Sequence, residues 1–171
     1  MLNFLFGGLT AQPAHGVALF DAATREARLP HWYRDGQVPD TLEGRFALLA
    51  TVIALVMTRL EALGEDGVRL SVALTERFVE VMESEHRELG IGDPTLGKTV
   101  RKLVAALSRR VDLWRAALAG EGGWSEAAID SLPGELGAAG YRTESLRALA
   151  DRLAASSLEQ LARGQIMGET A

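Results

Sequence analysis

Two helices of this chain meet at RELGIGDPTLGK, residues Arg87 to Lys98. Gly90 suits the end of the first helix, because glycine enters the left-handed conformation without a Cβ penalty. Asp93 offers its carboxylate to the free amides of the next helix, and Pro94 suits the first helical position, where no backbone donor is needed. The stretch therefore predicts a short, defined corner. Because no catalytic group lies in it, it points to a binding or assembly role.

The sequence on both sides of this corner has a helical pattern. Strand-type alternation is missing, and glycine or proline separates the helical segments. We predict helices over about residues 15–28, 41–63, 65–89 and 94–118, a short one between Ser125 and Pro133, and a last one over 143–163. Residues 29–40 are predicted to be an irregular connector whose aromatic rings contact the core.

The predicted helix over residues 41–63 is the most apolar one. Asp40 or Thr41 would cap its start, and Gly64 would end it. Its inward stripe is Leu42, Phe46, Leu49, Ile53, Val56, Leu60 and Leu63. Further apolar side chains lie off this stripe, which indicates a helix with contacts on most sides. The predicted fold class is all-α: a single-domain bundle of five to six helices with a central apolar helix.

Length and composition agree with one domain. A chain of 171 residues with 47% hydrophobic residues can bury its own core. We expect the helical domain to span residues 13–163, with flexible segments at 1–12 and 164–171. Residues 1–10 are apolar but lack the basic region and cleavage site of a secretory signal, so they are interpreted as a floppy or docking tail. The apolar run Phe46 to Met57 is well short of the roughly 20 residues that cross a bilayer.

The charge is unevenly distributed. The net charge of -5 gives no general reason to bind nucleic acid, and no DNA partner is expected. Residues 87–115 hold seven basic and three acidic residues, a charge of +4, which leaves -9 on the rest of the chain. We call Lys98, Arg101, Lys102 and Arg109, which project opposite the apolar stripe of their helix, the basic ridge. It is either a solvated helix surface or a contact for RNA, anionic lipid or an acidic partner.

The usual signatures of catalysis and metal binding are missing from the sequence. The absence of cysteine excludes disulfides, thiolate metal sites and cysteine nucleophiles. Glu83 and His86 have the spacing of a di-iron ligand pair, but that site needs the motif twice. No nucleophile elbow and no phosphate-binding glycine loop occurs. We therefore expect no catalytic residue, no metal and no cofactor. A small hydrolase stays an alternative, which would need a closed pocket with convergent polar groups.

Two segments together resemble the ubiquinol–cytochrome c chaperone family, the bacterial and mitochondrial assembly factors of the cytochrome bc1 complex. The first is ARLPHWYRDGQVPDTLEGRF, residues 27–46, and the second is the corner at 87–98. They occur in this order, with about forty residues between them. The resemblance runs from about Phe20 to Leu118. It departs from bacterial members at Val52, where they often have histidine, and at Leu107 to Arg110, where they have an aromatic-Tyr-Gly-Arg stretch.

The resemblance implies an all-α chaperone, not an enzyme, that binds newly made cytochrome b and assists biogenesis of the ubiquinol–cytochrome c reductase complex. Its implied partners are cytochrome b or another membrane-protein client and, as for mitochondrial members, the ribosome and a small helical protein. A cytoplasmic location is expected, either free or peripheral at the inner face of the cytoplasmic membrane. The alternative function is an adaptor that binds a membrane surface or the ribosome through the basic ridge.

Residues that match the family pattern or form the basic ridge are the candidates for the contact surface. They are Tyr33, Asp40, Thr41, Gly44, Arg45, Arg87, Glu88, Leu89, Gly90, Gly92, Asp93, Lys98, Arg101, Lys102 and Arg109. Structural roles stay open for single members: Gly44 would permit close packing, and Arg45 would pair with Asp40 or Glu43. A chaperone that binds an apolar client is expected to expose an apolar groove beside the basic ridge.

Overall fold

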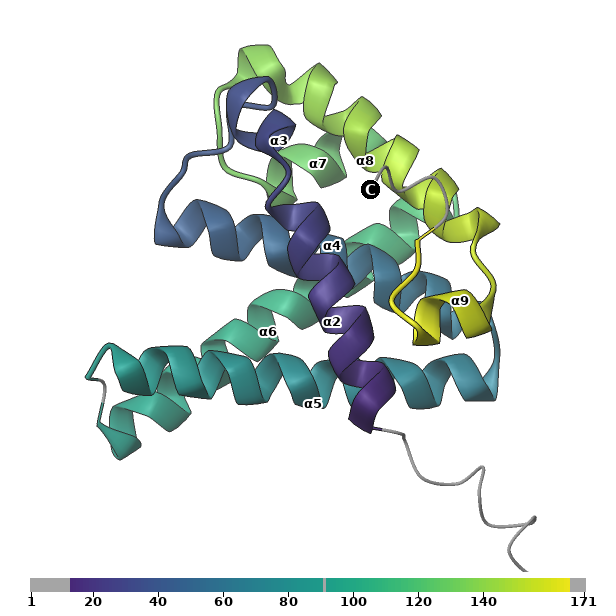
Figure 1. The fold of residues 1–171 in the computed structure, drawn as a ribbon. Coiled ribbons are helices and arrows are strands. Elements are labelled where there is room, and N and C mark those ends of the chain that lie inside the picture. The colour runs from purple at the N-terminus through teal and green to yellow at the C-terminus, as the bar shows by residue number, and fades with distance from the viewer. Residues whose placement is uncertain (1–12, 91, 167–171) are drawn as a thin grey trace, which may run out of the picture.

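The computed structural model describes residues 13–90 and 92–166, and this part of the chain is helical without strands. The all-α prediction is confirmed (Figure 1). Its elements are α2 (Pro13–Ala27), α3 (Pro30–Arg34), α4 (Leu42–Glu61), α5 (Glu65–Glu88), α6 (Asp93–Leu118), α7 (Trp124–Ser131), the 3-10 helix η1 (Leu136–Ala138), α8 (Ala139–Ala155) and α9 (Leu158–Ala162). No helix of the described residues is long and apolar enough to span a membrane.

The described residues form eight α-helices, where the sequence predicted five to six. Two of them, α3 and α9, have only five residues each. The helix α3 occupies residues 30–34 of the segment that was predicted to be irregular, so that prediction is wrong for these five residues and holds for residues 35–40. Pro30 starts this single turn, and Trp32 Nε1 donates to the carbonyl of Glu26 at 3.0 Å. Tyr33 Oη donates to the carbonyl of Ala27 at 2.8 Å, so both rings attach the turn to the end of α2.

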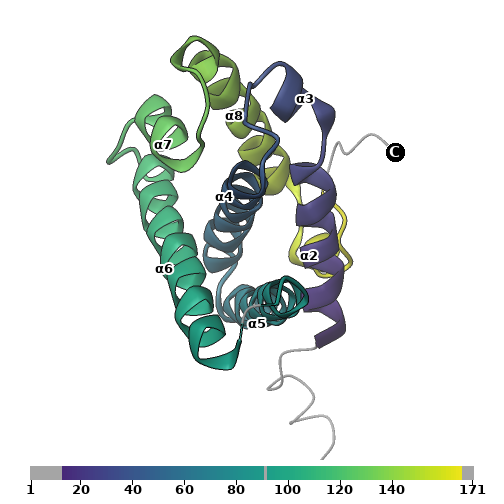
Figure 2. The same cartoon turned by 90° about the vertical axis from the view of Figure 1, so that its left-hand side faces the viewer.

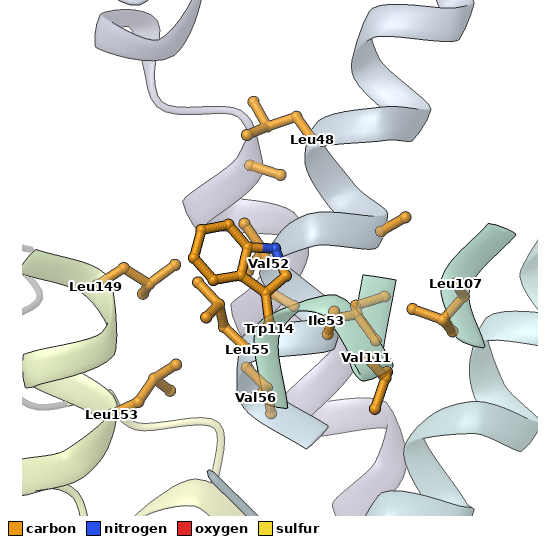
Figure 3. Packing of buried hydrophobic residues seen from close by; sticks show 14 of the residues in the cluster. Leu48, Val52, Ile53, Leu55, Val56, Leu107, Val111, Trp114, Leu149 and Leu153 are labelled. Atoms are coloured by element: carbon orange, nitrogen blue, oxygen red, sulfur yellow. The ribbon is translucent and has the colours of Figure 1, made fainter. Parts of the chain in front are cut away.

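The helix α4 contacts α2, α5, α6, α7 and α8. Val52, Ile53 and Val56 are fully buried in the core around it. Figure 3 shows Leu149 and Leu153 approaching this core from α8 and Val111 and Trp114 from α6. Val52, which departs from the bacterial family pattern, is therefore a packing residue in this chain.

The first turns of α4 differ from the prediction. Leu42 begins the predicted inward stripe but is 67% exposed, and Phe46 and Leu49 are only half-buried. The inward assignment of Leu42 is wrong, because none of the described elements covers its side chain at the start of α4. The cap is as predicted, since the Thr41 hydroxyl accepts a bond from the amide of Gly44 at 3.1 Å.

The corner between α5 and α6 has the predicted helix end, with Gly90 at a φ of +80°. The predicted cap at Asp93 is displaced by one residue. The carbonyl of Gly92 accepts the amides of Thr95 and Leu96 at 3.0 and 2.9 Å, so Gly92 is the N-cap and Asp93 is already helical. The helix can start earlier because Gly92 adopts an extended conformation, with φ -69° and ψ 154°.

The last predicted helix begins earlier than expected and is broken in two. It starts at Ala139 instead of Thr143, whose hydroxyl donates back to the carbonyl of Ala139 at 2.9 Å within the helix. The break follows from Ser157, which forms a capping box with Gln160 and starts α9. Arg142 of α8 is buried and donates to the carbonyl of Gly36 at 2.8 Å, which ties α8 to the segment after α3.

Candidate functional site

An open groove of about 1520 Å³ lies between α2, the first half of α4 and the second half of α5. We call it the α4 groove. Figure 2 looks at this face, with α4 and α5 seen nearly end-on and α2 beside them. The segment after α2 and Leu103 of α6 complete its lining. The groove exists because α4 and α5 diverge from each other toward the corner at Gly90.

The floor of the α4 groove is apolar. Leu42 and Leu89 are 67% and 63% exposed, and they lie on different helix ends. Phe46 follows Leu42 by one turn of α4 and also lines the groove, with its ring centroid 6.2 Å from that of the buried Phe78. The other apolar lining residues are Phe20, Ala27, Leu49, Val81, Met82 and Leu103. Exposed apolar strips with a polar rim are typical of sites that bind another protein or a membrane.

The rim of the α4 groove is charged with both signs. Arg45 Nε lies 2.6 Å from Asp40 Oδ1, and this hydrogen bond lowers the pKa of the Asp40 carboxyl below its ordinary value. The guanidinium of Arg77 lies 6.0 Å from the centre of the Phe20 ring and also pairs with Glu80 at 3.2 Å. A polar rim around an apolar centre is the usual build of a protein interface. Because acidic and basic side chains both line the groove, the rim favours no single sign of ligand.

The groove brings together five of the predicted contact residues from two segments far apart in the sequence. They are Tyr33, Asp40, Arg45, Glu88 and Leu89. Burial raises the pKa of the Tyr33 hydroxyl above its ordinary value. Since the same hydroxyl is bonded to the carbonyl of Ala27, Tyr33 both supports and lines the groove.

Other predicted contact residues lie beside the groove without lining it. Gly44 is buried, and a Cβ at this position would lie 2.0 Å from the carbonyl oxygen of Pro39. This close contact lets the segment before α4 pack against the helix. The capping bond from the Gly44 amide to the Thr41 hydroxyl stabilises the start of α4. Arg87, Gly90 and Gly92 are exposed at the corner but do not line the groove, and Asp93 begins α6.

The basic ridge is separate from the groove. Lys98, Arg101, Lys102 and Arg109 are exposed along α6, while Leu103 of the same helix faces the groove. Within the described residues, no ion pair involves these four side chains.

The neighbouring cations of α6 are engaged instead. Arg110 Nη2 donates to the carbonyl of Ser131 at 2.9 Å, and Arg115 pairs with Glu61 at 3.0 Å. Among the described cations of α6, the exposed ones without an ion pair are therefore those of the basic ridge.

Some groove residues were missed by reasoning from the sequence. Phe46 and Leu49 were assigned to the core, but they are only half-buried and line the groove. Helical spacing marks both as apolar-face residues, but it does not tell a covered face from an open one. The inward assignment of Phe20 is confirmed, since it is buried in the core even though it also lines the groove. In the part of the chain that the structure describes, no cluster of three or more histidine and acidic side chains could hold a metal ion.

Comparison with known proteins gives two matches. The sequence model of the ubiquinol-cytochrome C chaperone family matches residues 34–131, which contain α4, α5, α6 and the corner. The fold is similar to the crystal structure of a Cbp3 homolog from Brucella abortus, with a TM-score of 0.74 and 27% sequence identity. The similarity covers 91% of this chain and 89% of that one. Among curated proteins, no match was found.

Proposed function

Because the chain belongs to the ubiquinol-cytochrome C chaperone family, we propose that it assists assembly of the cytochrome bc1 complex by holding an apolar segment of newly made cytochrome b in the α4 groove. The observation that supports this proposal most is the apolar floor of the groove. Family membership also supports a role without catalysis. In this role the chain binds the client and passes it to the membrane complex, and no covalent bond of the client is formed or broken.

The groove has the properties that such a client needs. A membrane-protein segment in water exposes apolar side chains, whose removal from water is favourable. Covering Leu42 and Leu89, which are 67% and 63% exposed, contributes on the order of 1–2 kcal/mol each. The charged side chains at the rim stay solvated around the client.

Gene deletion with rescue tests the proposal. Deletion is expected to lower cytochrome b and the assembled bc1 complex, and the unchanged chain is expected to restore both. Leu42→Asp and Leu89→Asp place a charge on the groove floor and should fail to rescue. Both side chains are exposed, so the substitutions should leave the fold intact, which circular dichroism checks.

Leu136→Asp is the matched control for these variants. Leu136 is 73% exposed but lies on η1, outside the groove, so its variant should rescue fully. Unchanged bc1 levels after deletion would contradict the chaperone function itself. Full rescue by the groove variants would instead contradict the α4 groove as the client site.

A second candidate function rests on the basic ridge. Four exposed cations without ion pairs in the described part of the chain favour an adaptor that binds anionic lipid or ribosomal RNA. Binding of this kind weakens steeply with salt, because it releases condensed counterions. Client capture through apolar contacts does not. A salt titration of client capture separates the two functions.

A further inference from the structure

A second, smaller groove lies along α5, away from the α4 groove. It has a volume of about 660 Å³. Val68 and Val72, one helical turn apart, are 46% and 49% exposed in it, and the half-buried Val79 continues the row. We call these three residues the valine strip. Met57 and Glu61 of α4 form the opposite wall.

The valine strip is a second apolar face of α5. At about 100° per residue, Val72 and Leu74 are separated by about 200° around the helix. Leu74 and Phe78 are fully buried in the core, so the strip points away from it. A helix that only packs on a bundle needs one apolar stripe. The valine strip is therefore an apolar surface that the described elements leave open.

The start of α2 lies close to this strip. The helix α2 crosses α5 (Figure 1), and a Cβ at Gly16 would lie 2.6 Å from the carbonyl oxygen of Ala73. Ala73 is the residue next to Val72. The chain that precedes α2, residues 1–12, lies outside the described residues. Its sequence, MLNFLFGGLTAQ, has six large apolar side chains and no charged one.

This segment is long enough to reach the strip. Twelve extended residues span up to about 40 Å, at about 3.3 Å each. Half the circumference of an α-helix with its side chains is about 17 Å. Passing around α5 therefore uses fewer than half of the residues, and the others can lie along the strip.

We propose that residues 1–12 pass around α5 and bury their apolar side chains on the valine strip. A short tether holds such a segment at an effective concentration in the millimolar range, so even a contact with a Kd of about 1 mM is half occupied. The segment then covers an apolar surface of its own chain and leaves the α4 groove open. The α2 residues that line the α4 groove start at Phe20, one turn beyond Gly16.

Disulfide trapping tests this contact directly, because the chain has no cysteine of its own. Leu5→Cys is combined with Val72→Cys on the strip, with Leu89→Cys in the α4 groove or with Leu136→Cys on η1. Under mild oxidation, the pair of residues 5 and 72 should close within one chain about tenfold faster than the other two. Faster closure with residue 89 would place the segment in the α4 groove. Equal rates, or disulfides between two chains, would also overturn the proposal.

A single-cysteine measurement complements the trapping. The Val72→Cys thiol should react with a soluble thiol reagent about twofold faster or more after residues 1–12 are deleted, because a strip that is half occupied or more is shielded to that extent. Leu136→Cys should react equally in both backgrounds. An unchanged Val72→Cys rate would contradict the proposal. Neither experiment involves a client. A negative result would therefore contradict the contact between residues 1–12 and the valine strip without bearing on the chaperone function.

Discussion

Gly44 and Gly97 are both helical glycines, but their surroundings are opposite. A Cβ at Gly44 would lie 2.0 Å from the carbonyl oxygen of Pro39, whereas a Cβ at Gly97 would meet no atom of the described residues within 4 Å. Gly44→Ala should therefore lower the free energy of unfolding by about 1–3 kcal/mol, because the backbone must shift. Gly97→Ala should raise it by about 0.5–1 kcal/mol, because glycine is a poor helix former.

Urea denaturation followed by circular dichroism measures both effects. Since the two variants add the same methyl group to a helix, each is the control for the other. Equal changes in the two variants would contradict the close contact between Gly44 and Pro39.

The surroundings of His31 lead to a prediction about how the free energy of unfolding depends on pH. Its ring stacks on Trp32 at 4.5 Å, and Nδ1 lies 3.3 Å from Tyr141 Oη. Burial lowers the pKa of His31 below 6.5, an effect that Glu26 and Asp35 oppose in part. As pH falls below about 6.5, the unfolded chain takes up this proton first. The stability contributed by neutral His31 is thus complete above that pH and is lost toward the lower pKa of the folded state.

His31→Gln should remove this part of the acid sensitivity. The difference in unfolding free energy between about pH 7.5 and about pH 5.5 should be smaller in the variant than in the unchanged chain. The carboxyls of Asp35 and Asp40, whose pKa values are lowered from 3.8 by arginine neighbours, contribute stability that is lost only below this range. An equal or larger pH dependence in the variant would contradict the assignment to His31.

At the scale of elements, variants of α6 can distinguish the two candidate functions, because this helix contributes to both proposed surfaces. Arg101 and Lys102 belong to the basic ridge, while Leu103, the next residue, lines the α4 groove. If the groove holds the client, reversing both charges with Arg101→Glu and Lys102→Glu should leave rescue of bc1 assembly within about twofold, since exposed charges contribute little to apolar binding. Loss of rescue, together with client capture that weakens steeply in salt, would favour the adaptor.

Arg163→Glu is a control for this double variant. Arg163 is an exposed cation far from α6 in the sequence, and it pairs with Glu159 of α9. Its reversal changes the net charge with the same sign but does not touch the ridge. Equal loss of rescue in both variants would indicate a general effect of charge.

The corner between α5 and α6 illustrates what local sequence can predict for an element. Gly90 required a left-handed conformation, and the structure has it there. The exact start of α6 was displaced by one residue, because either Gly92 or Asp93 can precede a helix. Short helices were harder to predict: α3 exists because Trp32 and Tyr33 bond to carbonyls of α2, and such bonds depend on the tertiary fold.

At the scale of the whole molecule, α4 should make unfolding cooperative. It contacts five other helices, so none of these can leave without exposing the core around Ile53. Circular dichroism follows all helices, whereas fluorescence follows Trp32 on α3 and the pair Trp114 and Trp124 on α6 and α7, whose rings lie 5.4 Å apart. The two probes should give the same urea midpoint. Separate midpoints would contradict a single cooperative domain.

The domain bounds predicted from the sequence, residues 13–163, remain a prediction. The described structure begins at Pro13, and its last described residue, Ile166, is buried in the core cluster. The predicted flexible segment at 1–12 lies outside the described residues. The segment beginning at 164 lies partly outside them too, although the amide of Gly164 donates to the carbonyl of Leu161 at 2.9 Å.

The sequence by itself determined the all-α class, the long helices and the corner at Gly90, because these depend on local propensity and on apolar spacing along the chain. It also determined the family, through residues 27–46 and 87–98. Only the tertiary structure decided that Leu42 and Leu89 lie open in one groove and that Gly44 is buried. The physical reason is that spacing defines the apolar face of each helix, whereas the packing of the other helices decides which parts of that face are covered.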